Sequence, residues 1–149
     1  MNVARVYTRN VVATRHSSNL QQAAMLMRER HVGALLVIGD EARTDSAVGI
    51  ITDRDLVVQA MAEGVNPQEA NVGDVMTPDV ATIGESADIH EAMETMRELG
   101  VRRLAVTGED DTIVGILSFD DIIDALATEV ASLADIIRSE CDREADELG

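Results

Sequence analysis

The sequence contains no lysine and no tryptophan, and Tyr7 and Phe119 are its only aromatic residues. With so few rings, it has no stacking platform for the bases of a single-stranded nucleic acid. Acidic residues outnumber basic ones by 28 to 12, and the formal net charge of −16 repels nucleic acid and anionic membranes. We therefore expect no nucleic-acid partner and no membrane partner. Because lysine is missing, any bound phosphate must be met by arginine, histidine, backbone amides or a metal ion.

Long hydrophobic runs are also missing, since no apolar stretch reaches the roughly 18 residues that a membrane span requires. The N-terminus lacks the basic region and following apolar region of a signal peptide, so we expect a cytoplasmic protein. The single cysteine, Cys141, lies in a strongly polar stretch without partners for a disulfide, a metal or a nucleophile. The 149 residues, 46% of them hydrophobic, suffice for one compact domain or two small interlocked ones.

The chain consists of two copies of one unit. Residues 3–37 align with residues 72–106 without a gap at an offset of 69, and pairs such as Val3/Val72, Ser17/Ser86 and Met27/Met96 are identical. After a loop that is three residues longer in the first copy, Gly49 aligns with Gly115 and Asp55 with Asp121 at an offset of 66. We assign residues 3–63 to the first repeat, 64–71 to a linker, 72–127 to the second repeat and 128–149 to a C-terminal helix or tail.

Hydrophobic spacing predicts the same element order, β-α-β-β-α, in both repeats, and thus an α+β fold. After a short lead-in and a brief strand, a polar turn with Ser17 or Ser86 as candidate N-cap opens a helix. Its apolar positions Leu20, Ala23, Ala24 and Met27 have helical spacing, and we interpret this methionine-bearing stripe as core. Two strands and a closing helix follow. The two repeats are expected to bury apolar faces against each other.

Each repeat contains a strand that ends at a small hydroxyl residue, with a carboxylate three positions later at the start of a helix. The pairs are Thr52 with Asp55 and Ser118 with Asp121. Such a corner aims free N–H groups and the positive end of a helix dipole at one point, which favours an anionic ligand. Alternatively, each pair is a helix cap with an acidic partner in the first turn. The duplication of the pair favours a binding role.

The closing helix of the second repeat continues into the tail with apolar residues from Ile122 to Ile137. That pattern is longer than one β-α-β-β-α unit needs. Two interpretations stay open: the helix packs on its own module, or it packs against a second subunit.

Taken together, the segments VGDVMTPDVATI, AMETMRELGVRRLAV and VGILSFDDI, preceded by MRERHVGALLV and VGIITDRDLV, resemble a pair of cystathionine-β-synthase (CBS) domains, also called a Bateman module. The resemblance covers nearly the whole chain. It implies two repeats related by a pseudo-two-fold axis, two clefts between them, and a homodimer. It also implies a regulatory ligand that contains adenosine: AMP, ADP, ATP, NAD or S-adenosylmethionine.

In that family each cleft is built from both repeats, and the resemblance therefore implies two sets of binding residues. One cleft takes Thr52, Arg54 and Asp55 with Thr82, Ile83, Val101, Arg102 and Arg103. The other takes Ser118 and Asp121 with Ala13, Thr14, Val32, Gly33 and Ala34. A carboxylate such as Asp55 can accept both hydroxyls of a ribose, and the hydroxyl residue with the helix amides suits a phosphate oxygen.

The two clefts are not expected to be equal. Arg102 and Arg103 stand where the first repeat has Gly33 and Ala34, so the cleft at Asp55 should prefer a phosphorylated nucleotide. The cleft at Asp121 is expected to be roomier and less basic. As the alternative, Arg102 and Arg103 pair with surface carboxylates. Ala13 and His16 depart from the family pattern in the first repeat.

We predict a regulatory module that senses adenine nucleotides and signals occupancy to an unknown effector protein. The alternative is a structural or dimerisation module with vestigial clefts. An enzyme is not expected, because neither a Ser/His/Asp or Cys/His arrangement nor a metal constellation is evident. His90 and Glu94 have the spacing of a surface helix contact.

Overall fold

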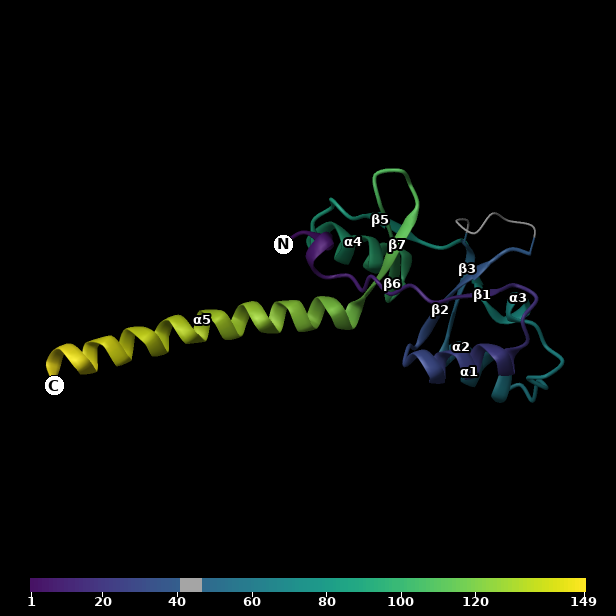
Figure 1. Cartoon of the computed structure of the whole chain (residues 1–149), viewed down its shortest axis with the longest axis horizontal. Coiled ribbons are helices and arrows are strands. Elements are labelled where there is room, and N and C mark those ends of the chain that lie inside the picture. The colour runs from purple at the N-terminus through teal and green to yellow at the C-terminus, as the bar shows by residue number, and fades with distance from the viewer. Residues whose placement is uncertain (41–46) are drawn as a thin grey trace.

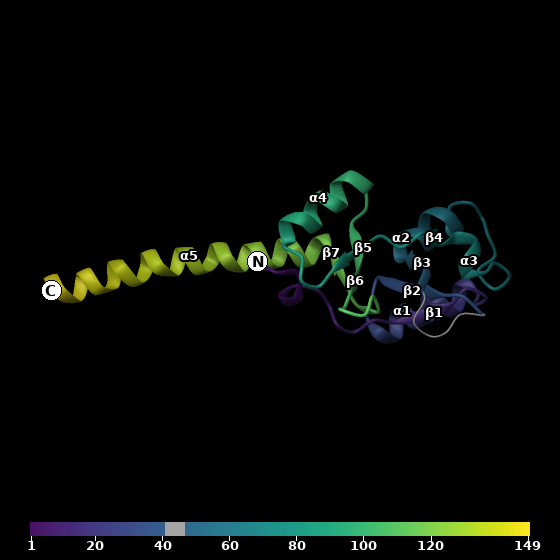
Figure 2. The same ribbon diagram turned by 90° about the horizontal axis from the view of Figure 1, so that it is seen from above.

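A computed structural model describes residues 1–40 and 47–149. Its two units, each a small sheet with helices, lie side by side in both views (Figures 1 and 2). One sheet has the strand order β1-β2-β3-β4 and the other β5-β6-β7. The predicted α+β fold of two β-α-β-β-α repeats is confirmed.

The first unit consists of β1 (Ala13–Arg15), α1 (Leu20–Arg30), β2 (Ala34–Ile38), β3 (Ala47–Thr52) and α2 (Asp53–Asp55). The second consists of β5 (Thr82–Gly84), α4 (Ile89–Leu99), β6 (Arg103–Thr107), β7 (Ile113–Ser118) and α5 (Phe119–Leu148). In each unit the first strand is parallel to the second, and the second is antiparallel to the third. The matching register places the ends of β3 and β7 at equivalent positions.

The methionine-bearing helix faces are core, as the spacing predicted, except that Ala24 is exposed. Leu20, Ala23 and Met27 of α1 are buried with the strand residues of the first unit, and Ile89, Ala92 and Met96 of α4 are buried with those of the second. The predicted caps Ser17 and Ser86 are wrong, because Asn19 and Asp88 cap these helices instead. Asn19 forms a capping box with Gln22, an amide pair that satisfies two free N–H groups at once.

The two lead-in segments are exchanged between the units. Val3, in the 3₁₀ turn η1 (Val3–Arg5), is buried in the core of the second unit, and its N–H donates to Ala87 at 2.9 Å. Val72, in α3 (Val72–Val75), is buried in the core of the first, and its N–H donates to Ser18 at 2.7 Å. The short strand β4 (Thr77–Pro78) completes the first sheet. Each lead-in segment therefore belongs to one repeat in the sequence but packs in the core of the other unit. This exchange ties the two units together.

The closing helices of the two units differ. In the first, α2 runs into a π-helical turn η2 (Leu56–Met61), after which the N–H of Ala62 donates to Val57, five residues back. In the second, α5 continues for 30 residues and extends away from both units (Figure 1). Packing of the tail on its own module is therefore wrong beyond the first turns of α5. No helix in the described part of the chain is both long and apolar enough to cross a membrane.

Candidate functional site

Two clefts lie between the units, and the first, the Asp55 cleft, has a volume of about 280 Å³. One wall is the end of β3 and the start of α2, with Thr52, Arg54 and Asp55. The opposite wall comes from the second repeat and includes Val101, Arg102 and Arg103. Six of the residues predicted for this cleft thus line it. The remaining lining residues are Ile50, Thr77, Asp79, Val80, Ala81, Gly100 and Ala105.

The hydroxyl–acid pairs are capping boxes, and they also line the clefts. The N–H of Thr52 donates to Asp55 Oδ2 at 2.9 Å, and the N–H of Asp55 donates to Thr52 Oγ1 at 3.1 Å. Ser118 and Asp121 repeat both distances. Each carboxylate therefore uses one oxygen for its helix. Within the described residues the other oxygen of Asp55 and of Asp121 accepts no hydrogen bond. The cap interpretation is therefore confirmed, and the binding interpretation stays a prediction that the position of the pairs in the clefts is compatible with.

The second cleft, the Asp121 cleft, has a volume of about 250 Å³. It contains Ser118 and Asp121 from the end of β7 and the start of α5, with Val32, Gly33 and Ala34 from the first repeat. The other lining residues are Thr8, Asn10, Val12, His31, Arg103, Ile116 and Asp120. The prediction of a roomier Asp121 cleft is wrong, because its volume is slightly below that of the Asp55 cleft.

Residue for residue, the two clefts correspond at the offsets of 66 and 69 found in the sequence. Thr8 matches Thr77, Val32 matches Val101, and Ile116 matches Ile50. Charge breaks the correspondence, because Asp120 replaces Arg54 and the small Gly33 and Ala34 replace Arg102 and Arg103.

Among the residues that the structure describes, the Asp55 cleft accordingly has three arginines against two aspartates, and the Asp121 cleft one arginine against two aspartates. The prediction of a less basic Asp121 cleft agrees with this lining.

Arg103, at the start of β6, lines both clefts. Its side chain is half-buried and makes no ion pair among the described residues. The alternative for the two arginines, pairing with surface carboxylates, therefore applies only to Arg102. That side chain lies 3.9 Å from Asp120 and stacks over the ring of Phe119 at 5.0 Å from the centroid. Both partners of this ion pair are largely exposed, so the pair is weak.

Four of the predicted residues lie outside the clefts, and this corrects the sequence-based set. Thr14 and Ile83 are buried, Thr82 is exposed, and Ala13 lines a separate cavity of about 100 Å³. Strand alternation directs Thr14 and Ile83 into the core, whereas Ala13 and Thr82 point away from the core and lie outside the clefts.

The residues just before β1 and β5 line the clefts in place of the predicted strand residues. Val12 and Ala81 line the clefts, and their carbonyls accept from Leu36 at 3.0 Å and Ala105 at 2.8 Å. Sequence reasoning also missed Thr8, Asn10, Thr77 and Asp79. The identity of Thr8 and Thr77 at the repeat offset was the available signal.

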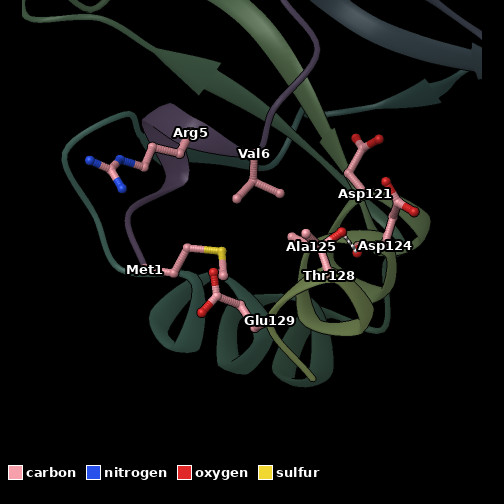
Figure 3. Close-up of a pocket in the computed structure, with 8 residues that line it drawn as sticks. All are labelled: Met1, Arg5, Val6, Asp121, Asp124, Ala125, Thr128 and Glu129. Atoms are coloured by element: carbon pink, nitrogen blue, oxygen red, sulfur yellow. Dashed lines mark hydrogen bonds between the residues drawn. The ribbon is translucent and has the colours of Figure 1, made fainter. Parts of the chain in front are cut away.

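A third crevice, about 320 Å³, lies beside the Asp121 cleft, between the N-terminal segment and the first turns of α5. Figure 3 shows Asp121, Asp124 and Glu129 of α5 on one side and Arg5 and Val6 on the other. Within the described part of the chain, no group of three or more His, Cys, Asp or Glu side chains is arranged to hold a metal ion. His90 and Glu94 are 4.0 Å apart on the surface of α4, as their spacing predicted.

The family model that matches is that of the CBS domain, at residues 3–61 and 72–128. The chain therefore belongs to the CBS domain family.

An uncharacterised protein of Methanopyrus kandleri is 30% identical over 133 residues, which are 89% of this chain and 66% of that protein. Hypoxic response protein 1 of Mycobacterium tuberculosis is 34% identical over 123 residues, which are 82% of this chain and 83% of that protein.

Two solved structures give the structural comparison. Hypoxic response protein I, solved with two coordinated zinc ions, matches with a TM-score of 0.68 and 31% identity, over 83% of this chain and 98% of that one. A CBS domain protein of Pyrobaculum aerophilum, solved in complex with AMP, matches with a TM-score of 0.75 and 19% identity. It covers 89% of this chain and 99% of that one, and at this identity it supports the shared fold alone.

Proposed function

We propose that this chain is a regulatory module that binds an adenine nucleotide in the Asp55 cleft and signals its occupancy to an effector protein. The observation that carries the proposal is the lining of that cleft. A half-buried carboxylate with one free oxygen stands across from Arg102 and Arg103 of the other repeat. AMP is the first ligand to test, because the Pyrobaculum protein with the same fold was solved in complex with it.

Each part of a nucleotide has a matching group in the Asp55 cleft. The free oxygen of Asp55 accepts from ribose hydroxyls in charge-assisted hydrogen bonds, each contributing about 1.5–3 kcal/mol. Arg54, Arg102 and Arg103 meet the phosphate. Ile50, Val80 and Val101 provide aliphatic walls for the adenine faces, so no aromatic side chain is needed.

The Asp121 cleft holds a less charged ligand, or the same ligand more weakly. Its acid–hydroxyl corner repeats that of the Asp55 cleft, but Arg103 is the only arginine among its described lining residues. We take the candidate ligands of the module to be AMP, ADP, ATP, NAD and S-adenosylmethionine.

Signalling requires the ligand to bind one arrangement of the two units better than another. Both clefts join residues of the two repeats, so a bound nucleotide contacts both units and favours one angle between them. We propose that the effector binds the altered arrangement, and that the module acts as a homodimer without catalytic activity of its own.

Calorimetric titration with AMP, ADP, ATP, NAD and S-adenosylmethionine tests the proposal, with the variant Asp55→Asn as the probe of the site. The amide oxygen of asparagine still accepts from the N–H of Thr52, so the cap persists while the free acceptor becomes a donor. We expect affinity for the best ligand to fall roughly 10- to 100-fold, the equivalent of one charge-assisted hydrogen bond.

Asp74→Asn is the matched control, because Asp74 accepts from the N–H of Asn71 in an equivalent capping box of α3, away from both clefts. It should bind as the wild type does. If none of the five compounds binds, or if Asp55→Asn binds them unchanged, the regulatory proposal fails. The structural module with vestigial clefts then remains.

A further inference from the structure

Helix α5 carries an apolar stripe that nothing in the described part of the chain covers. We define the α5 stripe as Ile123, Leu126, Val130, Leu133 and Ile137. These side chains are 41–64% exposed. At 1.5 Å per residue, the 30 residues of α5 span about 45 Å, and Figure 1 shows most of this length free of both units.

The α5 stripe is not the side of the helix that packs on the module. Ile122 is the residue of α5 buried in the second core. Figure 3 shows Asp124, Ala125 and Thr128 on the side that faces Val6 of the N-terminal segment. At about 100° per residue, the centre of the stripe lies about 150° around the helix from the midpoint of Ala125 and Thr128 and about 60° from Ile122, so the module contacts α5 beside the stripe and only at the first turns of the helix. A separate partner is therefore needed to cover it.

The spacing and residue types of the stripe point to a two-stranded coiled coil. The residues are separated by three and four positions in turn, which is a heptad pattern. The first position of each heptad is β-branched in Ile123, Val130 and Ile137, and the fourth is leucine in Leu126 and Leu133. This combination favours parallel dimers. We infer that a second copy of this chain covers the α5 stripe, in a parallel coiled coil over residues 123–137.

The residues that flank the stripe favour this occupant and this direction. In a parallel pair, Glu129 of one copy lies beside Ala134 of the other, and Ile136 beside Cys141, so like charges do not meet. An antiparallel pair would bring the two copies of Glu129 together. In coiled coils, charged residues at the flanking positions normally determine which different helix is bound as the partner. On one flank these positions are Ala127, Ala134 and Cys141, which provide no such selection.

The coil ends after Ile137 because the next stripe positions are Glu140 and Glu144. In a parallel pair, each glutamate faces its own copy, and like charges across the seam are unfavourable. Beyond residue 137 the two helices therefore separate.

Sedimentation equilibrium of the full chain, with Leu133→Glu as the probe, tests this interface. We expect a wild-type dimer and at least a tenfold weaker association in Leu133→Glu, with an unchanged fold by circular dichroism, since Leu133 is exposed in the monomer. Ser132→Glu is the matched control, because it adds the same charge one residue away and off the stripe. A monomeric wild type, or a Leu133→Glu variant that dimerises unchanged, would overturn the inference.

Two further variants test direction. In a Cys141→Ser background, Leu133→Cys should form an interchain disulfide on mild oxidation, because equivalent residues meet only in a parallel pair. Glu140→Leu should tighten the parallel dimer at least tenfold, whereas an antiparallel overlap of residues 119–137 leaves position 140 outside the seam. Absence of the disulfide together with unchanged affinity in Glu140→Leu would overturn the parallel arrangement. Nucleotide binding plays no part in these readouts.

Discussion

At the scale of single residues, one side chain holds a helix start and lines a cleft at the same time. The carboxylates of Asp55 and Asp121 each accept from the backbone N–H three residues earlier and leave an oxygen for the interdomain space. An alanine at either position would remove the carboxylate's half of the capping box and the ligand contact together. Asparagine separates the two roles, because its amide keeps an acceptor for the cap.

Gly115 illustrates a residue whose side chain must be absent. A Cβ there would overlap the ring of Tyr7 and lie 2.5 Å from the carbonyl oxygen of Thr8, where the exchanged lead-in crosses β7. We expect Gly115→Ala to lower the free energy of unfolding by about 1–3 kcal/mol, as overpacking does. Urea unfolding measures this.

Gly84→Ala is the control for this change, because its new Cβ meets no atom closer than Ser86 Oγ at 4.0 Å. It should change stability by no more than about 0.5 kcal/mol. Equal effects of the two substitutions would contradict the assigned role of the lead-in contact.

At the scale of elements, the start of α4 ties the chain's N-terminus to the second unit. Asp88 caps the helix by accepting from the N–H of His90 at 2.9 Å, and it pairs with the N-terminal ammonium at 3.1 Å. The hydrogen bond from His90, and then the ammonium, lower the pKa of Asp88 below its ordinary 3.8. The carboxylate of Asp88 therefore both caps α4 and holds the exchanged lead-in against the second unit.

The lowered pKa of Asp88 predicts a pH dependence of stability. Because the folded-state pKa is below the unfolded one, the contribution is complete above pH 3.8 and is lost as the pH falls through the folded value. Asp88→Asn keeps the cap but not the charge. Its Tm should lie below that of the wild type at pH 6, and the difference should shrink as the pH falls below 3.8 and through the lowered pKa of Asp88. A difference that is constant over this range would show that the charge of Asp88 contributes nothing.

At the scale of the whole molecule, Arg103 connects the two clefts. It lines both, while its equivalent in the first repeat is Ala34. A single guanidinium cannot meet two phosphates in separate clefts equally well. If both clefts bind phosphorylated ligands, occupancy of one should weaken the other.

Titration with AMP measures this coupling. Since the clefts differ in affinity even without coupling, the comparison is with Asp55→Asn, whose Asp55 cleft stays largely empty. We expect the Asp121 cleft to bind AMP about tenfold more weakly in the wild type, with the Asp55 cleft occupied, than in this variant, which corresponds to a coupling of about 1.4 kcal/mol. Adenosine, which has no phosphate, should bind without coupling. Arg103→Gln should weaken AMP binding and remove this coupling, while Arg54 and Arg102 keep the Asp55 cleft the tighter of the two. Coupling that persists in Arg103→Gln would rule out Arg103 as its origin, whereas a failure of AMP to bind at all would contradict the proposed function itself.

The sequence alone determined the fold class, the duplication and the hydroxyl–acid corner of each cleft, but fewer than half of the described lining residues. These follow from local patterns: strand and helix periods, a repeat offset, and a hydroxyl–acid pair at each strand-to-helix corner. The Thr52–Asp55 and Ser118–Asp121 pairs were identified because the same spacing produces both a cap and a cleft wall.

Tertiary structure decided what local patterns leave open. The exchange of Val3 and Val72 between cores depends on which unit each lead-in packs against, and the repeated sequence allows either. Thr14 and Ile83 were predicted to line the clefts but are buried, because the register of their strands decides which side chains face inward. Arg103 reaches both clefts because its strand starts between them, a fact about the arrangement of two units in space that no spacing along one chain contains.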